Sequence, residues 1–127
     1  MDGNRLLASQ GSGSDNSTFT DQGGYYISPN GLIMQWGSVP VDDSKTVIYE
    51  ECNKYTITFP MKFPNKLLSL NVSLEMHGAE PTGNVSPYVY ESSTEGAWGI
   101  IDLGYYTSYT RINQTFGAKV SYFAIGY

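Results

Sequence analysis

The chain has 127 residues, of which 40% are hydrophobic and only 15% charged, and its formal net charge at pH 7 is −5. This length predicts one domain, and the acidic balance argues against nucleic acid or an anionic membrane surface as a partner, because either would be repelled. No apolar run approaches the roughly 20 residues of a membrane span, so we expect no insertion into a membrane.

Residues 1–22, MDGNRLLASQGSGSDNSTFTDQ, have the Gly, Ser, Asp and Asn content of a flexible segment. Apart from residues 5–8 and Phe19 they offer nothing to bury. We therefore expect a flexible tail, or a connection to something upstream, over residues 1–22. The folded domain is expected over residues 23–127.

A hairpin is predicted at the start of the domain. The candidate strands 25–28 and 32–39 flank the sequence Ser28-Pro29-Asn30-Gly31. Proline presets the first corner of a turn, and asparagine followed by glycine suits a left-handed residue. The second strand begins with apolar residues on both of its faces, which predicts burial on two sides.

Further strand candidates follow at regular intervals, separated by turn clusters. In residues 54–61 and 66–76 apolar residues recur at every second position, as in half-buried strands. The face expected to be buried in the second of these comprises Leu68, Leu70, Val72, Leu74 and Met76. The candidate strands are 25–28, 32–39, 46–49, 54–61, 66–76, 85–91, 98–103, 107–116 and 119–127.

No helix is expected anywhere in the chain. Eleven tyrosines and fourteen glycines favour strands and turns over helices. The sequence therefore predicts an all-β fold, an antiparallel β-sandwich of about seven or eight strands. Because the last candidate strand runs to the final residue, we also expect the C-terminus to be held in place.

Catalysis is not expected. The acidic pairs at 42–43 and 50–51, and the nearby Glu91 and Glu95, fit solvated turns better than the two carboxylates of a glycosidase cleft. His77 has no second histidine or cysteine at ligand spacing, so it could serve a metal only where three chains meet. We therefore expect no enzyme activity, no cofactor and no metal within one chain.

Tyrosine is the strongest functional signal. Tyrosine and tryptophan combine a flat apolar face with a polar tip, as many binding surfaces require. Sugars present a matching mixture of C–H faces and hydroxyl groups. The alternative is that these aromatic residues pack against strands or a neighbouring subunit. The candidate ligand-binding residues are Tyr88, Tyr90, Glu91, Trp98, Asp102, Tyr105, Tyr106, Tyr109 and Arg111.

Three blocks of the sequence occur in an order that is typical of one protein family. They are PNGLIMQWGSV, then YTITFPMKFPN some twenty residues later, and finally YFAIGY at the C-terminus. Together they resemble the C-terminal tip domains of bacteriophage or prophage tail fibres, which open on a Gly-Leu-Ile-x-Gln-Trp-Gly strand, continue through Phe-Pro-x-x-Phe-Pro and end on Ala-Ile-Gly or Ala-Ile-Gly-Tyr. The resemblance frames residues 24–127, and residues 77–115 carry no family signature.

The resemblance implies a homotrimeric β-sandwich at the distal end of the fibre, on the host-facing side of the virion, similar in arrangement to H-type lectins. Residues 1–22 would then be the end of the fibre shaft. Because Cys52 is the only cysteine, no disulfide can form within one chain, and assembly would supply stability. The residues of the blocks are expected to be structural: Leu32, Ile33, Trp36, Phe59, Phe63 and Phe123.

The resemblance also implies that variable loops recognise a receptor on the bacterial surface during host attachment. The acidic balance favours sugar rings over phosphate groups, so the expected partner is a surface polysaccharide or lipopolysaccharide. A loop of an outer-membrane protein is the alternative partner. Two other functions stay open: a structural trimerisation cap of the fibre without its own ligand site, and a polysaccharide depolymerase, for which the chain is short.

Overall fold

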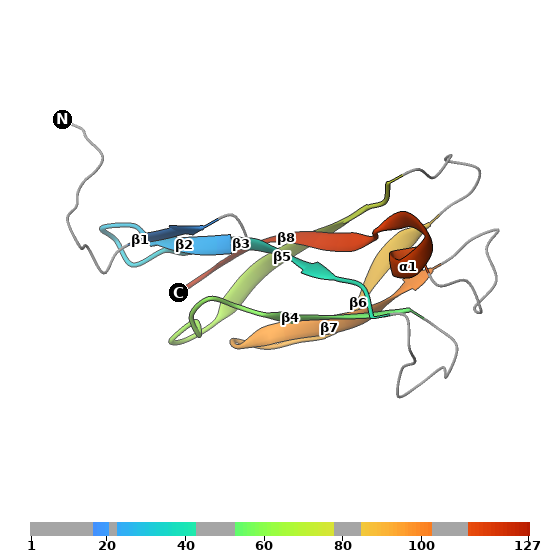
Figure 1. Cartoon of the computed structure of the whole chain (residues 1–127). Coiled ribbons are helices and arrows are strands. Elements are labelled where there is room, and N and C mark those ends of the chain that lie inside the picture. The colour runs from blue at the N-terminus through green and yellow to red at the C-terminus, as the bar shows by residue number, and fades with distance from the viewer. Residues whose placement is uncertain (1–16, 21–22, 43–52, 78–84, 103–111) are drawn as a thin grey trace.

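The computed structural model describes residues 17–20, 23–42, 53–77, 85–102 and 112–127, which form two antiparallel sheets in two layers (Figure 1). The eight strands of these residues confirm the expected all-β sandwich. The five-stranded large sheet has the order β1 (Ser17–Thr20), β2 (Gly23–Ile27), β3 (Ile33–Pro40), β8 (Lys119–Gly126) and β5 (Leu67–Glu75). The three-stranded small sheet has the order β4 (Lys54–Thr58), β7 (Gly96–Asp102) and β6 (Ser86–Ser92).

The predicted hairpin is confirmed as β2 and β3, which pair from Ile27 opposite Ile33 onward. Its turn is closed by two backbone hydrogen bonds, in which Ser28 N donates to Leu32 O and Gly31 N donates to Ser28 O, at 2.8 and 2.9 Å. Gly31 has a φ of 92°, a conformation that favours glycine. The Asn-Gly corner is thus needed for the backbone geometry.

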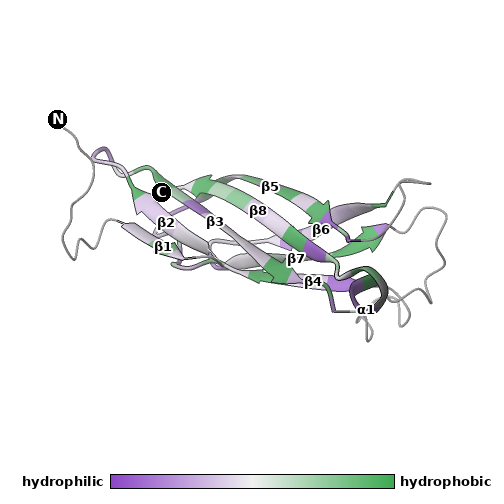
Figure 2. Ribbon diagram, turned by 45° about the horizontal axis from the view of Figure 1, so that its top comes forward, coloured by the Kyte–Doolittle hydropathy of each residue, from purple (hydrophilic) through white to green (hydrophobic). Residues whose placement is uncertain are grey.

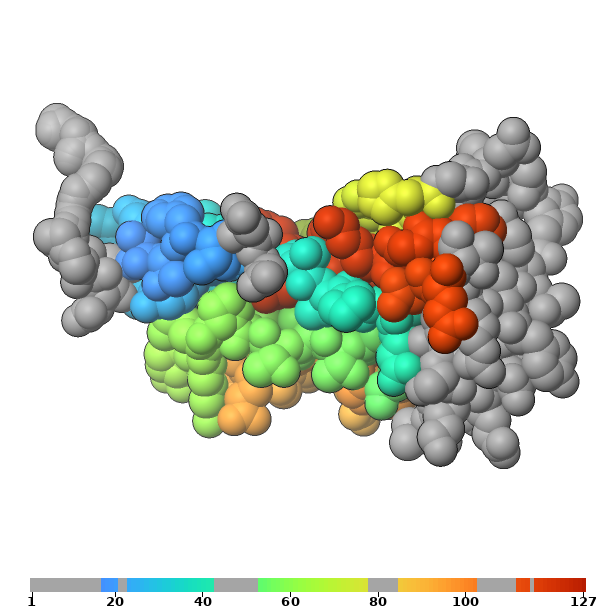
Figure 3. Space-filling view, viewed as in Figure 1, coloured from blue at the N-terminus to red at the C-terminus, as the bar shows by residue number. Residues whose placement is uncertain are grey.

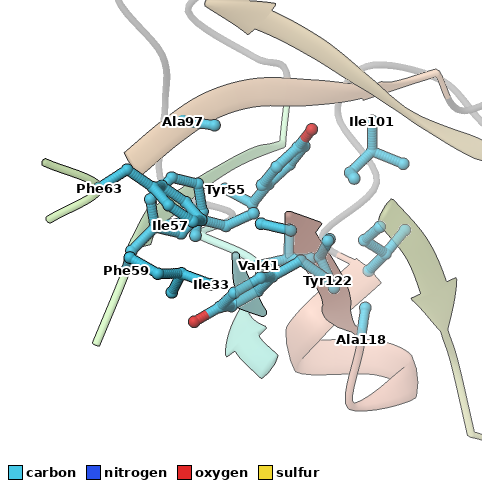
Figure 4. Close-up of a cluster of buried hydrophobic side chains, with 13 residues drawn as sticks. Ile33, Val41, Tyr55, Ile57, Phe59, Phe63, Ala97, Ile101, Ala118 and Tyr122 are labelled. Atoms are coloured by element: carbon cyan, nitrogen blue, oxygen red, sulfur yellow. The ribbon is translucent and has the colours of Figure 1, made fainter. Parts of the chain in front are cut away.

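The core fills the space between the two sheets (Figure 4). Tyr55 and Ile57 alternate inward from β4, and Phe59 continues this buried face, as the sequence predicts. Along β8 every second residue is likewise buried. Figure 2 shows hydrophobic and paler residues alternating along β5. The core comprises Ile33, Val41, Tyr55, Ile57, Phe59, Phe63, Ala97, Ile101, Ile112, Ala118, Val120, Tyr122 and Ala124.

One polar side chain, Gln35 of β3, lies within this core with none of its surface exposed. Its amide nitrogen donates to Met61 O at 2.7 Å, and its carbonyl oxygen accepts from Met61 N at 2.9 Å. A buried backbone N–H and C=O need partners, and here one side chain supplies both. Gln35 therefore links β3 to the segment that follows β4.

Residues 17–20 belong to the segment that the sequence assigns to the tail, but they form the edge strand β1. Thr18 pairs with Tyr25, and the ring of Phe19 lies 5.3 Å from that of Trp36. A strand of four residues gives too short a periodic pattern to be recognised in sequence. It forms here because β2 supplies hydrogen bonds and Trp36 supplies a ring contact. The division of the chain at residue 22 otherwise stays a prediction.

The spacing of apolar residues predicted that Leu68 lies on the buried face of β5, but in the structure it does not. The pairing of β5 with β8 shifts between Leu67 and Ser69, which is the signature of a β-bulge. Leu68 is the extra residue of this bulge, so it falls out of phase with Leu70 and is 52% exposed. Leu70, Val72 and Leu74, beyond the bulge, pack against the core as expected.

The prediction of a strand over residues 107–116 is wrong for its last five residues, which form the helix α1 (Ile112–Phe116). Ile112 is fully buried, and the side-chain nitrogen of Asn113 donates to Val41 O at 2.8 Å. Gly117 ends the helix with a φ of 62°, as glycine does at many helix C-termini. One helical turn of five residues is too short to show a helical period. The rest of that candidate, and the candidate 46–49, lie outside the described residues.

The C-terminus is held in place, which confirms the expectation for the last strand. Tyr127 N donates to Lys66 O at 2.9 Å, and Tyr127 O accepts from both Asn65 N and Lys66 N at 2.7 Å. This end of the sandwich also carries the β2–β3 turn, while α1 lies at the opposite end (Figures 1 and 3). In the described residues no helix has the length and apolar character needed to cross a membrane.

Candidate functional site

The outer face of the small sheet collects the polar and aromatic residues of three strands. In β7 Ala97, Gly99 and Ile101 are buried, so the alternating residues, Trp98 among them, point away from the core. The pairing of β6 with β7 places Tyr88 opposite Ile100 and Glu91 opposite Trp98. The β6–β7 hairpin thus brings its outward residues onto one surface, and β4, on the other side of β7, adds its own.

A β-bulge in β6 gives this surface its aromatic pair. The register shifts between Val89 and Glu91, so Tyr90 is the extra residue of the strand. Its ring stacks on that of Trp98 with 5.0 Å between ring centroids and 6° between ring planes. Tyr90 is still 47% exposed, so the stack leaves much of its surface available to a ligand.

Trp98 is held from several directions. Its indole Nε1–H donates to Glu91 Oε1 at 2.9 Å. The ammonium of Lys54 lies 5.0 Å from the centroid of the indole ring, at cation–π distance. Because β4 and β6 lie on opposite sides of β7, Lys54 and Tyr90 approach the indole from opposite sides. Both faces of the Trp98 ring are therefore occupied, and the role of Trp98 is to position Tyr90, Lys54 and Glu91.

A buried tyrosine fixes β6 from beneath this surface. The hydroxyl of Tyr55 donates to Tyr88 O at 2.7 Å. It passes Gly99, where a Cβ atom would lie only 2.7 Å from the Tyr55 oxygen. Burial raises the pKa of Tyr55 to about 12, so the phenol keeps its proton and remains a donor at neutral pH.

An open hollow of about 750 Å3 adjoins the Tyr90–Trp98 stack. Its volume falls in the range of about 300–1,000 Å3 that is usual for small-molecule sites. The wall formed by β4 carries Thr56 and Thr58, and the turn between β6 and β7 supplies Glu95. Hydroxyl and carboxylate groups therefore face the same space as the edge of Trp98.

The described structure brings five of the nine predicted site residues to the outer face of the small sheet: Tyr88, Tyr90, Glu91, Trp98 and Asp102. The other four, Tyr105, Tyr106, Tyr109 and Arg111, lie outside the described residues. The sequence did not identify the residues that β4 and the β6–β7 turn add to the site. The polar alternation of β4 showed that Thr56 and Thr58 face outward, but no sequence signal shows that β4 pairs with β7.

His77 and Glu75 lie at the end of β5 in the large sheet, apart from Glu91 and Glu95, which line the hollow of the small sheet. His77 pairs with Glu75, with 2.9 Å between Nε2 and Oε2. Among the residues that the structure describes, no group of three or more His, Cys, Asp or Glu side chains is placed to hold a metal ion. Glu91 is engaged by the indole of Trp98. The chemistry that this surface offers is hydrogen bonding and aromatic contact.

Solved structures of R1 pyocin fibres share this fold. A structure of the P. aeruginosa R1 pyocin fibre, comprising C-terminal residues, has a TM-score of 0.61 and 21% sequence identity, and the match covers 87% of this chain and 27% of that one. An N-truncated R1-type pyocin tail fibre has a TM-score of 0.62 and 23% identity, covering 87% of this chain and 84% of that one. At such identities the likeness establishes the fold alone.

The fold is thus one that tail fibres use. The family model described as the C-terminal part of a putative tail fiber protein, gp53-like, matches residues 26–127. The chain belongs to this family, which confirms the resemblance drawn from the three sequence blocks. The likeness to H-type lectins stays a prediction.

A curated relative matches a smaller part of the chain. An uncharacterised protein of Methanocaldococcus jannaschii is 41% identical over 54 residues, which cover 42% of this chain. The match spans about a third, 32%, of the length of that relative.

Proposed function

We propose that this domain binds a receptor on the bacterial cell surface during host attachment, and that the receptor is a glycan. The observation that carries the proposal is the outer face of the small sheet, where exposed tyrosines stand beside a polar hollow. Tyr88 and Tyr90 are 55% and 47% exposed, and aromatic rings exposed together on one face are typical of interaction sites. Aromatic residues beside hydroxyl groups suit the mixed surface of a sugar.

The places where the described segments stop support a host-facing role for the end of the sandwich that carries α1. The described chain leaves the sandwich there after Asp42, His77 and Asp102. Backbone contacts hold two of these residues near other elements: Asp42 forms a β-bridge with Lys54, and His77 N donates to Phe116 O at 2.6 Å. β1, the first described element, enters at the opposite end (Figure 1). A fibre shaft that joins at β1 would direct the α1 end toward the host, and the hollow that Met61 and Glu95 line would then lie on the flank of the domain nearer the shaft.

The outer face of the large sheet supports assembly into a homotrimer. Register places Phe19, Gly24, Trp36 and Phe123 in one row across β1, β2, β3 and β8. The next row contains Tyr26, Met34 and Ile125. Phe19, Tyr26 and Phe123 on this apolar face are exposed in the single chain, and burying the face against further copies gains roughly 25 cal/mol per Å2. The same face favours the alternative function, a trimerisation cap without a ligand site.

Binding to whole cells tests receptor recognition. The protein is incubated with a panel of bacterial strains, and binding to a positive strain is compared for the wild type, Tyr90→Ala and Val89→Ala. We expect loss with Tyr90→Ala and retention with Val89→Ala, a neighbouring change that leaves the aromatic pair intact. If Tyr90→Ala, Glu91→Gln and Trp98→Ala all bind as the wild type does, this face is not the receptor site and the cap is favoured.

Treatment of the cells separates the two classes of receptor. Periodate oxidises sugar diols, so we expect binding to fall on periodate-treated cells and to persist on protease-treated cells. The reverse pattern rejects the glycan and identifies an outer-membrane protein as the receptor. Loss of polymer viscosity on incubation with the protein would instead support a depolymerase.

A further inference from the structure

We propose that the hollow beside the Tyr90–Trp98 stack is a subsite for an uncharged sugar with vicinal hydroxyl groups, and that it discriminates against acidic sugars and phosphate. Glu91 and Glu95 would accept the sugar hydroxyls. This inference rests on the proposed function, because it names the class of glycan that the same surface would recognise. It assigns ligand contact to Glu95, for which the sequence predicted a solvated turn.

Hydrogen bonds fix the backbone of the turn that carries Glu95 and orient the side chain of Glu91. The turn between β6 and β7 is closed by Ser93 N, which donates to Gly96 O at 2.8 Å. Glu95 N donates to Ser93 Oγ at 3.1 Å, and Glu95 O accepts from Phe59 N at 2.9 Å. Glu91 is oriented by the indole N–H of Trp98. The carboxylate of Glu91, held in this way, loses little freedom when a ligand binds, which favours affinity, whereas the bonds of Glu95 fix its backbone.

The charge of the hollow selects the class of ligand. Two carboxylates, Glu91 and Glu95, line it against one ammonium, Lys62, while the ammonium of Lys54 lies over the Trp98 ring at 5.0 Å from its centroid. A carboxylate has two oxygens and can accept from two neighbouring hydroxyl groups at once. A uronic acid or a phosphate would instead bring a second negative charge to the same space. At contact distance in water, one such repulsion weakens binding by about fivefold.

The remaining lining fits a neutral polar ring. Thr56 and Thr58 lie on the exposed side of β4, and Ser92 and Ser93 line the hollow from β6 and the turn. Thr58 pairs with Gly96, which has no side chain, so the outer face stays open next to Trp98. Because Tyr90 and Lys54 flank the indole ring, hydrogen bonds contribute more to recognition here than stacking on Trp98.

The two tryptophans of the chain provide a site-specific measurement. Trp98 donates its indole proton to Glu91, whereas Trp36 lies in the large sheet. In a 1H–15N spectrum of the full chain, titration with neutral hexose oligosaccharides should shift the Trp98 indole signal and leave that of Trp36 in place. A uronic-acid oligosaccharide of equal length should bind at least fivefold more weakly, and inorganic phosphate should cause no shift.

Charge-neutral variants test the selectivity. Glu95→Gln keeps the size of the side chain, so we expect weaker binding of the neutral oligosaccharide and a ratio of neutral to acidic affinity that approaches one. Glu75→Gln, a carboxylate on β5 of the other sheet, is the matched control and should change neither quantity. Acidic oligosaccharides that bind as tightly as neutral ones, or shifts confined to Trp36, would overturn the subsite.

Whole-cell binding, measured in parallel, separates this inference from the proposed function. Binding to cells without a Trp98 shift from any oligosaccharide overturns the sugar subsite and leaves receptor binding standing. A Trp98 shift with an oligosaccharide, without binding to any strain that displays it, supports the subsite and counts against receptor binding by the domain.

Discussion

The ring of Phe63 lies against the backbone of Gly126, where a Cβ atom would stand 2.6 Å from the ring Cδ1. This contact joins two of the sequence blocks that are shared with the family. The third block reaches both, since Ile33 pairs with Gly126 and Gln35 binds the backbone of Met61. The three blocks, widely separated in the sequence, therefore form one packing unit at the end of the sandwich that carries the C-terminus.

We expect Gly126→Ala to destabilise the domain by about 1–3 kcal/mol, the usual cost of inserting a methyl group into a filled site. The new Cβ atom would collide with the Phe63 ring and with the backbone oxygen of Lys66. The measurement is denaturant unfolding at a fixed protein concentration. Ser121→Ala, on the same strand, adds no atoms and serves as the control. An unchanged midpoint for Gly126→Ala would contradict the tight packing described above.

Gln35→Leu should be more costly, because it leaves the N–H and C=O of Met61 without their side-chain partner. Each unsatisfied buried group costs about 1–3 kcal/mol, so we expect a loss of about 2–4 kcal/mol in the free energy of unfolding. Thr56→Val makes a polar-to-apolar change at an exposed position of β4 and should change it by less than about 0.5 kcal/mol. Equal effects of the two substitutions would mean that the Gln35–Met61 bridge contributes nothing.

Alkaline pH should destabilise the fold through its buried tyrosines. Burial raises the pKa of Tyr55 from 10.0 to about 12 in the folded state, and the pKa of Tyr122 is raised for the same reason. Between these values the unfolded chain binds fewer protons than the folded one, so stability falls as pH rises from 10 to 12. Unfolding monitored over this window should give a shallower decline for Tyr55→Phe, with the remainder due to Tyr122. An identical decline in the variant would contradict this assignment.

A charge on the outer face of the large sheet should block assembly. Phe123 is 39% exposed in the single chain and lies in the row that contains Trp36. We expect the wild type to sediment at three times the mass of one chain, and Phe123→Glu to sediment as a monomer, because burying an unpaired carboxylate is strongly unfavourable. Tyr88→Glu places the same charge on the small sheet and should leave the trimer intact. A wild-type monomer at micromolar concentration would refute the assembly.

The sequence predicted those elements whose local pattern was long enough to carry a period. The alternation through Tyr55, Ile57 and Phe59 identified β4 and its buried face, and the Asn30-Gly31 corner identified the first hairpin. The short elements β1 and α1 were missed, because four or five residues make no period. Leu68 was misplaced, since a bulge depends on how two strands fit together and leaves no mark in the sequence of one strand.

Some features of the candidate site could be predicted from the sequence, and others could not. Aromatic composition pointed to Tyr88, Tyr90 and Trp98 as surface-forming residues, and the structure does expose the two tyrosines. The sandwiched position of Trp98 could not be predicted, because it depends on Lys54 from a strand more than forty residues earlier. Glu95 was read as a turn carboxylate for the same reason: the hollow exists only after β4 and β7 have paired.

By itself the sequence determined the fold class, the family and the hydrophobic faces of the long strands, because alternation and turn residues act over a few neighbouring positions. The tertiary structure alone decided which strands are neighbours, where a bulge shifts the register, and which polar groups meet in one hollow. Those features depend on long-range pairing, where packing of whole sheets outweighs the preferences of any single residue.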